Sequence, residues 1–206
     1  MQVQLDLYNS GKHPGNDADT IQTIKMVTEQ NERLSKMVKT LLDMSELQTV
    51  GRDETIIVNA LVDEVLADLE PLAQEKNIKL IGKCKDVNMV GSDILIYRLV
   101  YNLVENAIKY NHSGGQVSVE AYQREKQVCL SVKDTGNGIP EELKERVFEP
   151  FFRVDKSRSR ELGGVGLGLA LVNEIVRVHD GSIAIRPNPS GGTIIEVEFS
   201  VNRTTA

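Results

Sequence analysis

The stretch from residue 17 to residue 48 contains neither proline nor glycine and is rich in residues that favour helix. Its apolar side chains recur at alternating spacings of three and four residues, with Asn31 as an interruption. They are Ile24, Val27, Leu34, Val38 and Leu41. This spacing predicts one long helix whose apolar seam packs against other helices in a bundle or coiled coil.

Two short segments precede this helix. Residues 9–17, NSGKHPGND, are rich in Gly, Pro and Asn, which indicates a turn. The opening sequence MQVQLDLY alternates apolar and polar residues, a pattern that fits either a strand or the remnant of a helix. We interpret residues 1–50 as part of a helical hairpin.

The pattern changes at residues 49–54, TVGRDE, which we interpret as a domain boundary. Beyond it we expect strands near 56–58, 78–83, 117–122, 128–133, 182–186 and 193–200, and helices from about residue 60, from about residue 93 and over 167–178. Strands and helices do not strictly alternate here. Residues 51–206 are therefore expected to form an α+β fold, a two-layer sandwich with a mixed sheet and helices on one face.

Local signals predict how some of these elements begin, end and pair. Asn59 and Ser92 are expected to cap the helices that start near residues 60 and 93, and Gly181 to close the helix over 167–178. The strands near 117–122 and 128–133 alternate well enough to form an antiparallel pair.

Overall composition narrows the possible functions. The formal net charge of −6 argues against a general nucleic-acid binder, which usually has a basic surplus. No apolar run approaches the ~18 residues that a membrane span needs. Cys84 and Cys129 have no metal-ligand spacing, so we expect reduced, partly buried thiols in a cytosolic protein.

The helix expected over 97–111, YRLVYNLVENAIKYN, has a polar face and an apolar face. Asn102, Asn106 and Lys109 share the polar face because they lie four and three residues apart. One interpretation is an ordinary amphipathic helix with two amides at its solvent edge. The other is a binding site in which an amide oxygen serves a metal such as Mg²⁺ and the ammonium serves a phosphate.

The segment DTGNGIP, residues 134–140, follows an expected strand. It is either a simple glycine-rich turn or part of a binding site. In the second case, Gly136 and Gly138 let the backbone pass close to a flat ligand while Asp134 accepts a hydrogen bond. The amino group of a purine would suit that carboxylate, whereas the carbonyl of guanine at the same place would be repelled.

The segment 149–170 combines a basic run with glycines at the start of a helix. Arg153, Lys156, Arg158 and Arg160 are followed by Gly163, Gly164, Gly166 and Gly168. A basic run is usually a solvated loop. Here it leads into a helix start, where free N–H groups and the positive end of the helix dipole favour phosphate. The glycine spacing fits neither the dinucleotide-binding fingerprint nor the P-loop, which excludes those two classes.

Taken together and in this order, the motifs are specific. An Asn-bearing helix, then DxGxG, FxPFF and GxGLGLA, resembles the ATP-binding domain of two-component sensor histidine kinases, within the gyrase-like ATPase superfamily. Upstream, residues 32–48, ERLSKMVKTLLDMSELQ, are similar to the second helix of that family's dimerisation hairpin. The resemblance covers the chain from about residue 18 onward and implies ATP and Mg²⁺ as cofactors.

The resemblance also implies roles for individual residues. Asn106 would ligate Mg²⁺, with Asn102 helping to arrange the site, and Lys109 and Arg153 would meet the phosphates. Asn102, Lys109 and Arg153 would thus carry the catalysis. Tyr110 would lie beside the nucleotide. Asp134 would bind the adenine amino group, with Gly136, Gly138 and Ile139 around it and Thr193 near adenine. A phosphate-covering lid and its hinge would contain Gly164, Gly166, Leu167, Gly168 and Leu169.

The chain departs from the family in its histidines. These kinases phosphorylate a histidine in a motif of the type HExxTP on the first hairpin helix, and none of His13, His112 and His179 stands in such a motif. We expect the chain to begin inside the hairpin, without the acceptor histidine and the acidic base that follows it. On this hypothesis the chain binds ATP but does not phosphorylate itself.

The resemblance implies two protein partners. These are a second copy of the chain, paired through the hairpin in a four-helix bundle, and a response regulator that takes the phosphate onto an aspartate. Membrane attachment is expected only through segments outside this chain, with this portion in the cytoplasm.

Two alternatives to the kinase remain open. One is an ATP hydrolase or a serine kinase of the same superfamily. Gyrase-type hydrolases have Glu where this chain has Asn102, although Glu105 lies close by, and the serine kinases generally lack the long hairpin. The other alternative is a non-catalytic dimeric scaffold with a degenerate site. The retained nucleotide-contacting residue types argue against it.

Overall fold

The computed structural model describes residues 17–154 and 165–201. In chain order the elements are α2 (Asp17–Glu46), β1 (Glu54–Ile57), α3 (Val58–Glu75), β2 (Lys79–Cys84), β3 (Asn88–Gly91), α4 (Asp93–Lys109), β4 (Gln116–Arg124), β5 (Gln127–Asp134), the short 3₁₀ helices η1 (Glu141–Leu143) and η2 (Arg146–Phe148), α6 (Gly168–Val178), β6 (Ser182–Pro187) and β7 (Thr193–Ser200). Each element predicted after residue 16 has a counterpart among them.

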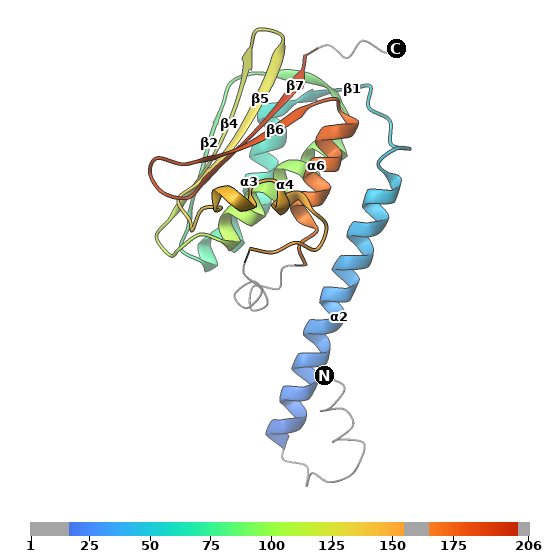
Figure 1. The fold of residues 1–206 in the computed structure, drawn as a ribbon, viewed down its shortest axis with the longest axis vertical. Helices are drawn as coiled ribbons and strands as arrows, with labels where there is room; N and C mark the ends of the chain where they lie inside the picture. Colours follow the sequence, from blue (N-terminus) through green and yellow to red (C-terminus); the bar gives the residue numbers. More distant parts are fainter. Residues whose placement is uncertain (1–16, 155–164, 202–206) are drawn as a thin grey trace.

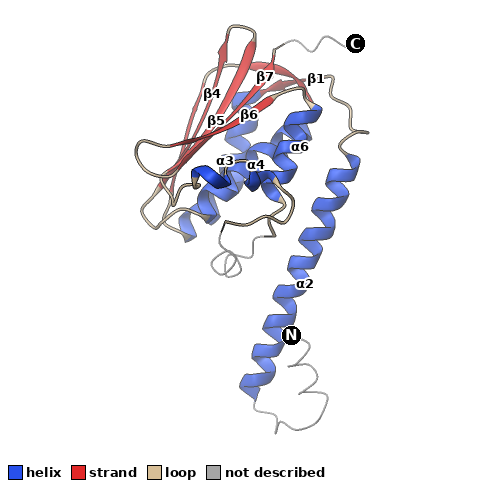
Figure 2. Ribbon diagram, viewed as in Figure 1, coloured by secondary structure: helices blue, strands red, loops and turns tan. Residues whose placement is uncertain are grey.

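The main sheet has five strands in the order β2-β4-β5-β7-β6. β2 and β4 run parallel and the other neighbours are antiparallel, so the sheet is mixed, as predicted. α3, α4 and α6 cover one face of this sheet (Figure 2), and α4 contacts both of the others. The predicted two-layer α+β sandwich is therefore confirmed. A second, two-stranded sheet pairs β1 with β3, and β3 was not predicted.

Alternation along the strands decides which face of the sheet is buried. Val117, Val119 and Ala121 of β4 point toward the helices and have no exposed surface. α3, α4 and α6 all contribute to the helical side of the core, and α4 contributes the most buried residues: Leu95, Ile96, Leu99, Val100, Leu103, Val104, Ala107 and Ile108. Full burial of each large apolar side chain contributes roughly 1.5–3 kcal/mol relative to exposure. The apolar face of α4 is thus fixed against the sheet.

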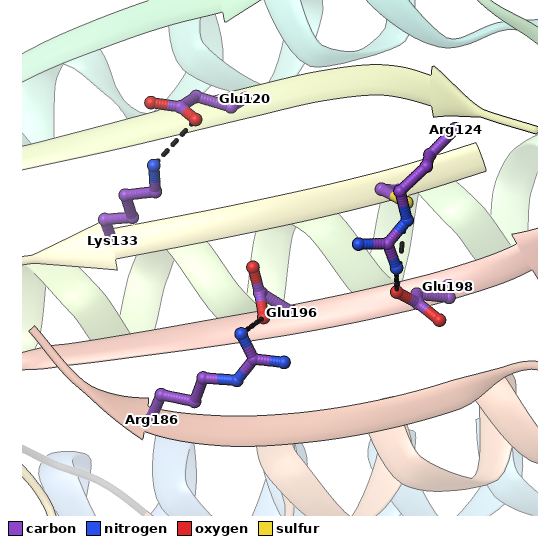
Figure 3. Close-up of polar contacts among 7 residues, drawn as sticks. Glu120, Arg124, Lys133, Arg186, Glu196 and Glu198 are labelled. Carbon is purple, nitrogen blue, oxygen red and sulfur yellow. Dashed lines mark hydrogen bonds and ion pairs between the residues drawn. The ribbon is translucent and has the colours of Figure 1, made fainter. Parts of the chain in front are cut away.

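The opposite face of the sheet is polar and carries ion pairs between strands (Figure 3). Lys133 lies 2.6 Å from Glu120, Arg186 lies 3.0 Å from Glu196, and Arg124 pairs with Glu198. Cys129 is buried beside the last of these pairs. Burial, and then the nearby Glu198 carboxylate, raise the pKa of its thiol. Both Cys84 and Cys129 are free thiols, as expected.

Two of the predicted helix caps are wrong in detail. α3 begins at Val58, so Asn59 lies inside the helix, and its amide donates to Asp86 Oδ1 at 3.2 Å. β1 leads directly into α3 because Val58 is buried and its N–H donates to Val87 O at 3.0 Å. Ser92 does precede α4 with an extended backbone, but its side chain makes no capping hydrogen bond.

α6 ends at Val178, as predicted. Gly181 does help to close the helix, because its N–H donates to Val176 O at 2.9 Å. The left-handed position after the helix, however, belongs to Asp180, with φ 53°. An aspartate tolerates this conformation better than most residues.

α2 extends well beyond the sheet and its helices (Figure 1). Its predicted seam is exposed, with Ile24 61%, Leu34 58% and Val38 56% accessible. Near its C-terminal end the helix joins the rest of the chain, where Asp43 Oδ1 lies 3.0 Å from Arg98 Nη1 on α4 and Leu47 is buried in the core. The turn and the first hairpin element predicted over 1–16 lie outside the described residues. Within the described part of the chain, no helix combines the length and apolar character that a membrane span requires.

Candidate functional site

A cavity of about 370 Å³ opens between α4, the ends of β5 and β7, and the start of α6. This volume is in the range of small-molecule binding sites. Its wall includes most of the residues that the sequence predicted for a site: Asn102, Asn106, Lys109, Tyr110, Asp134, Gly138, Ile139, Arg153, Gly166, Leu167, Gly168, Leu169 and Thr193. Gly136 does not line the cavity, and Gly164 lies outside the described residues, as do Lys156, Arg158 and Arg160.

The polar face of α4 forms one wall of the cavity. Asn102, Asn106 and Lys109 lie on it because the apolar face of the same helix is buried against the sheet. The Asn102 amide donates to Arg98 O at 2.7 Å, which orients the side chain. Lys109 Nζ lies 2.7 Å from Glu105 Oε1, one helical turn earlier. Glu105 was not predicted as a site residue, although its spacing of four from Lys109 is the signal that could have identified it.

Asp134 closes one end of the cavity, at the last position of β5. Its Oδ1 accepts hydrogen bonds from the N–H groups of Gly136, at 2.8 Å, and Thr193, at 3.2 Å. Among the described residues, no hydrogen bond reaches Oδ2. Burial raises the pKa of this carboxyl above its usual value of 3.8, while the two N–H groups act in the opposite direction. Gly136 does not line the cavity, but its N–H holds one oxygen of the Asp134 carboxylate in place.

The surroundings of Asp134 are mostly apolar. Val132 and Ile195 come from neighbouring strands, and Ile139 from the loop after β5. A carboxylate acceptor beside these apolar side chains suits a flat, largely apolar ring that carries a hydrogen-bond donor at its edge. This end of the cavity can therefore both enclose a heteroaromatic ring and fix its orientation.

The cavity wall also combines positive charge with the start of a helix. Lys109, Arg153 and the first residues of α6 line it. Gly168, the first residue of α6, leaves no room for a side chain, because a Cβ would lie 2.9 Å from Asn102 Oδ1. The helix start can thus approach the asparagines of α4 closely. Free N–H groups, the helix dipole and two cations together form a site for an anion such as phosphate.

Several residues of the cavity wall were missed by the sequence interpretation. Thr40 reaches the cavity from α2, while Phe152 and Val154 come from the segment after η2, and Asn137 and Pro140 from the loop after β5. Thr40 carried no local signal, because its contribution depends on how α2 lies against the rest of the chain. The described residues contain no group of three or more His, Cys, Asp or Glu side chains that could hold a metal.

A family model described as histidine kinase-, DNA gyrase B-, and HSP90-like ATPase matches residues 91–203. The matched range includes the polar face of α4, Asp134 and the start of α6. The chain belongs to this ATPase family. The description of this family covers both kinases and hydrolases. Individual relatives therefore indicate which of these two groups the chain resembles.

Curated relatives of the chain are sensor histidine kinases. It is 36% identical over 183 residues to the sensor-like histidine kinase SenX3 of Mycolicibacterium smegmatis, which covers 86% of this chain and 47% of the relative. It is 34% identical over 180 residues to the sensor histidine kinase RppB of Synechocystis sp., covering 85% of this chain and 40% of the relative. The chain thus spans about half or less of the length of these relatives.

Solved structures of the ATPase family are similar in fold. The catalytic domain of the histidine kinase ThkA aligns with a TM-score of 0.66 at 27% identity, covering 73% of this chain and 97% of that domain. ThkA in complex with the response regulator protein TrrA aligns with a TM-score of 0.78 at 25% identity, covering 99% of this chain and 58% of ThkA. The prediction of a histidine kinase ATP-binding catalytic domain is confirmed.

Proposed function

We propose that this chain is the ATP-binding catalytic part of a sensor histidine kinase, which transfers the γ-phosphoryl group of ATP to a histidine side chain and releases ADP. One observation carries the proposal. A single cavity is lined by a carboxylate acceptor with apolar neighbours, and also by two cations and the start of a helix. These two sets of residues match the two ends of ATP.

At the first end, Asp134 Oδ2 accepts a hydrogen bond from the amino group of adenine. Val132, Ile139 and Ile195 enclose the ring, while Thr193 holds the other carboxylate oxygen through its N–H. Guanine presents a carbonyl oxygen where adenine has its amino group, so the Asp134 carboxylate repels it. Tyr110 and Gly138 line the same cavity beside the nucleotide.

At the second end, Lys109 and Arg153 offset the charge of the phosphates, and the segment from Gly166 to Leu169, which leads into α6, faces them. Before nucleotide binds, Glu105 holds Lys109 in place through their ion pair of 2.7 Å. We propose that Gly164 belongs to the same phosphate-binding segment.

Amide oxygens and phosphate oxygens suit Mg²⁺, which is usually held by few protein ligands and by the substrate phosphates. Asn106 would hold this ion, and Asn102, oriented by Arg98 O, would arrange the site from one turn earlier. When bound, Mg²⁺ neutralises charge on the phosphates. The contribution of the chain's own residues is positioning and electrostatic stabilisation, which account for most of the catalysis in phosphoryl transfer. Asn102, Lys109 and Arg153 carry it.

We further propose a division into a hairpin domain, residues 1–50, and a catalytic domain, residues 51–206. The exposed apolar seam of α2 supports pairing with a second copy, because an unpaired stripe of this size is unfavourable in water. The response regulator found with ThkA supports a partner of the same class. ATP is supplied in the cytoplasm, which is where this part would act, with any membrane anchor in other segments.

Calorimetric titration with a non-hydrolysable ATP analogue, with and without Mg²⁺, tests the proposal on this chain. We expect a Kd in the micromolar range, about 7–8 kcal/mol, tightened by Mg²⁺ and weakened at least tenfold by Asp134→Asn. Absence of binding would instead favour a non-catalytic scaffold.

The hypothesis that the chain does not phosphorylate itself is tested separately from nucleotide binding. The sequence holds no HExxTP-type motif, so incubation with ATP and Mg²⁺ should leave no acid-labile phosphate on the chain. Steady release of free phosphate, measured at the same time, would favour an ATP hydrolase over a kinase.

A further inference from the structure

We infer that Asn188, in the turn between β6 and β7, is a positioning residue that sets the adenine selectivity of the site by holding Asp134 in place. This inference rests on the proposed function, because it concerns how the proposed adenine acceptor is oriented. Asn188 does not line the cavity and was not among the predicted site residues.

The side chain of Asn188 is bonded directly to the residue that it is inferred to position. Its Nδ2 donates to the backbone oxygen of Asp134 at 2.7 Å, across 54 positions of the sequence. Its Oδ1 accepts from the N–H of Ser190 at 3.1 Å. The backbone N–H of Asn188 donates to Gly192 O at 3.1 Å, and its carbonyl accepts from Gly191 at 2.9 Å. Asn188 therefore organises the turn and connects it to Asp134.

The far end of the same turn holds the carboxylate of Asp134. The N–H of Thr193 donates to Oδ1 at 3.2 Å. Gly192 packs so closely that a Cβ there would lie 2.3 Å from Asp134 O and 2.4 Å from Oδ1, and its φ of 88° also favours glycine. The turn thus contacts Asp134 at its main chain through Asn188 and at its side chain through Thr193.

The flanking residues make this arrangement rigid. Pro187 and Pro189 stand on either side of Asn188. Proline fixes its own φ and restricts the residue before it, so Pro189 limits the backbone of Asn188. Pro187 lacks an N–H. This removes no hydrogen bond from the outer side of β6, because β6 is an edge strand and has no partner strand on that side. A donor on a rigid turn can hold Asp134 to the few tenths of an ångström that selective recognition needs.

Loss of the Asn188 side chain is expected to affect only ligands that donate a hydrogen bond to Asp134. With one oxygen of Asp134 held by Gly136 and Thr193, the direction of Oδ2 depends on where the Asp134 backbone lies. Loss of the Asn188 amide releases the backbone carbonyl and misdirects Oδ2. A ligand that places an amino group against Oδ2 is weakened, whereas a ligand without that group is not.

The test compares two nucleotides on the whole chain by calorimetry: ATP and purine riboside triphosphate, which lacks only the amino group of adenine. The main variant is Asn188→Asp, which keeps an oxygen for the N–H of Ser190 but turns an acceptor toward Asp134 O. Asn188→Ala is the second variant, in case the first does not fold, and thermal melting checks both. Ser190→Ala is the matched control in the same turn, since the hydrogen bond of Ser190 uses its backbone.

We expect Asn188→Asp and Asn188→Ala to weaken ATP binding about tenfold, with the affinity for purine riboside triphosphate changed less than about twofold. Ser190→Ala should match the wild type with both nucleotides. Equal weakening of both nucleotides by the Asn188 variants would show general damage to the site and overturn the inference, as would unchanged ATP binding.

Asp134→Asn in the same series separates the two proposals. If it abolishes discrimination between the nucleotides while the Asn188 variants retain it, the adenine site stands and the inference about Asn188 fails. If the wild type itself binds both nucleotides equally, the proposed role of Asp134 fails first.

Discussion

The backbone N–H of Ser92, at the start of α4, donates a hydrogen bond of 3.1 Å to Nε2 of His179, at the end of α6. The other ring nitrogen, Nδ1, lies 2.8 Å from Ile175 O, to which it donates when Nε2 accepts. The ring is 3% exposed and meets the Phe199 ring edge-on, with centroids 5.9 Å apart. His179 therefore joins the two helices that carry the asparagines and the glycine-rich helix start of the site.

Replacement of His179 by leucine is expected to destabilise the fold. His179→Leu keeps most of the volume but leaves the buried N–H of Ser92 without its acceptor, which costs about 1–3 kcal/mol. Urea denaturation should show a lower midpoint with an unchanged slope. His112, which is exposed, provides the control, and His112→Leu should change the free energy of unfolding by less than about 0.5 kcal/mol. Equal midpoints for both variants would contradict the structural role of His179.

Asp134→Asn is expected to raise thermal stability while it weakens ATP binding. Burial raises the pKa of Asp134, so the stability linked to this carboxyl is fully present below 3.8 and is lost as the pH rises through the raised value. At neutral pH the ionised carboxylate therefore costs stability. An asparagine of the same shape avoids that cost and can still accept from Gly136 and Thr193 through its amide oxygen.

Thermal melting at several pH values checks this prediction. The melting temperature of Asp134→Asn should exceed that of the wild type at pH 7, and the difference should narrow as the pH falls toward 4. Asp53→Asn, at an exposed position outside the cavity, should follow the wild type at every pH. A lower melting temperature for Asp134→Asn at pH 7 would mean that the carboxylate charge stabilises the fold.

Much of the fold could be predicted because it follows from local patterns. The strands near 117–122 and 128–133 were recognised from alternation, and in the structure they pair antiparallel as β4 and β5, with Val119 opposite Val132. β3 was missed because Asn88–Gly91 is short and is defined by its pairing with β1, which lies far from it in the sequence. Asn59 was misread as a cap because cap preference is a local signal, whereas the start of α3 is set by the burial of Val58 in the tertiary fold.

The site was predictable to the extent that its residues cluster in sequence. Asn102, Asn106 and Lys109 share a helix face, and the glycines precede a helix, so their types and spacings were visible. Asn188 and Thr40 could not be found in this way. Each acts across a large sequence separation, and an asparagine in a turn or a threonine on a helix has the same local appearance with or without that contact.

Gly168→Ala is expected to act through Asn102. The new Cβ would lie 2.9 Å from Asn102 Oδ1, and moving that side chain breaks its hydrogen bond to Arg98 O. We expect the variant to fold and to weaken Mg²⁺-dependent binding of an ATP analogue by about fivefold, because that hydrogen bond is worth about 1 kcal/mol and orients the amide. A double-mutant cycle with Asn102→Ala is the measurement. In the Asn102→Ala background, which removes the obstructing oxygen, Gly168→Ala should cause no further loss. Additive losses of affinity would show that Gly168→Ala acts on another part of the start of α6 and not through Asn102.

The ion pair between Asp43 and Arg98 is expected to hold the C-terminal end of α2, and with it Thr40, against α4. Both side chains are partly buried and their charged atoms lie 3.0 Å apart, so the pair is worth up to about 1 kcal/mol. Asp43→Ala or Arg98→Ala should therefore raise the rate of amide hydrogen exchange in residues 40–46 by up to about fivefold, with exchange in β4 and β5 unchanged.

The exchanged-charge variant, Asp43→Arg with Arg98→Asp, should restore slow exchange in residues 40–46. Arg186→Ala removes a pair of the same 3.0 Å length on the outer face of the sheet and should leave α2 unchanged. If Arg186→Ala accelerated exchange in α2 as much as Arg98→Ala, the loss of stability would be global and the pair would not be the contact that holds α2.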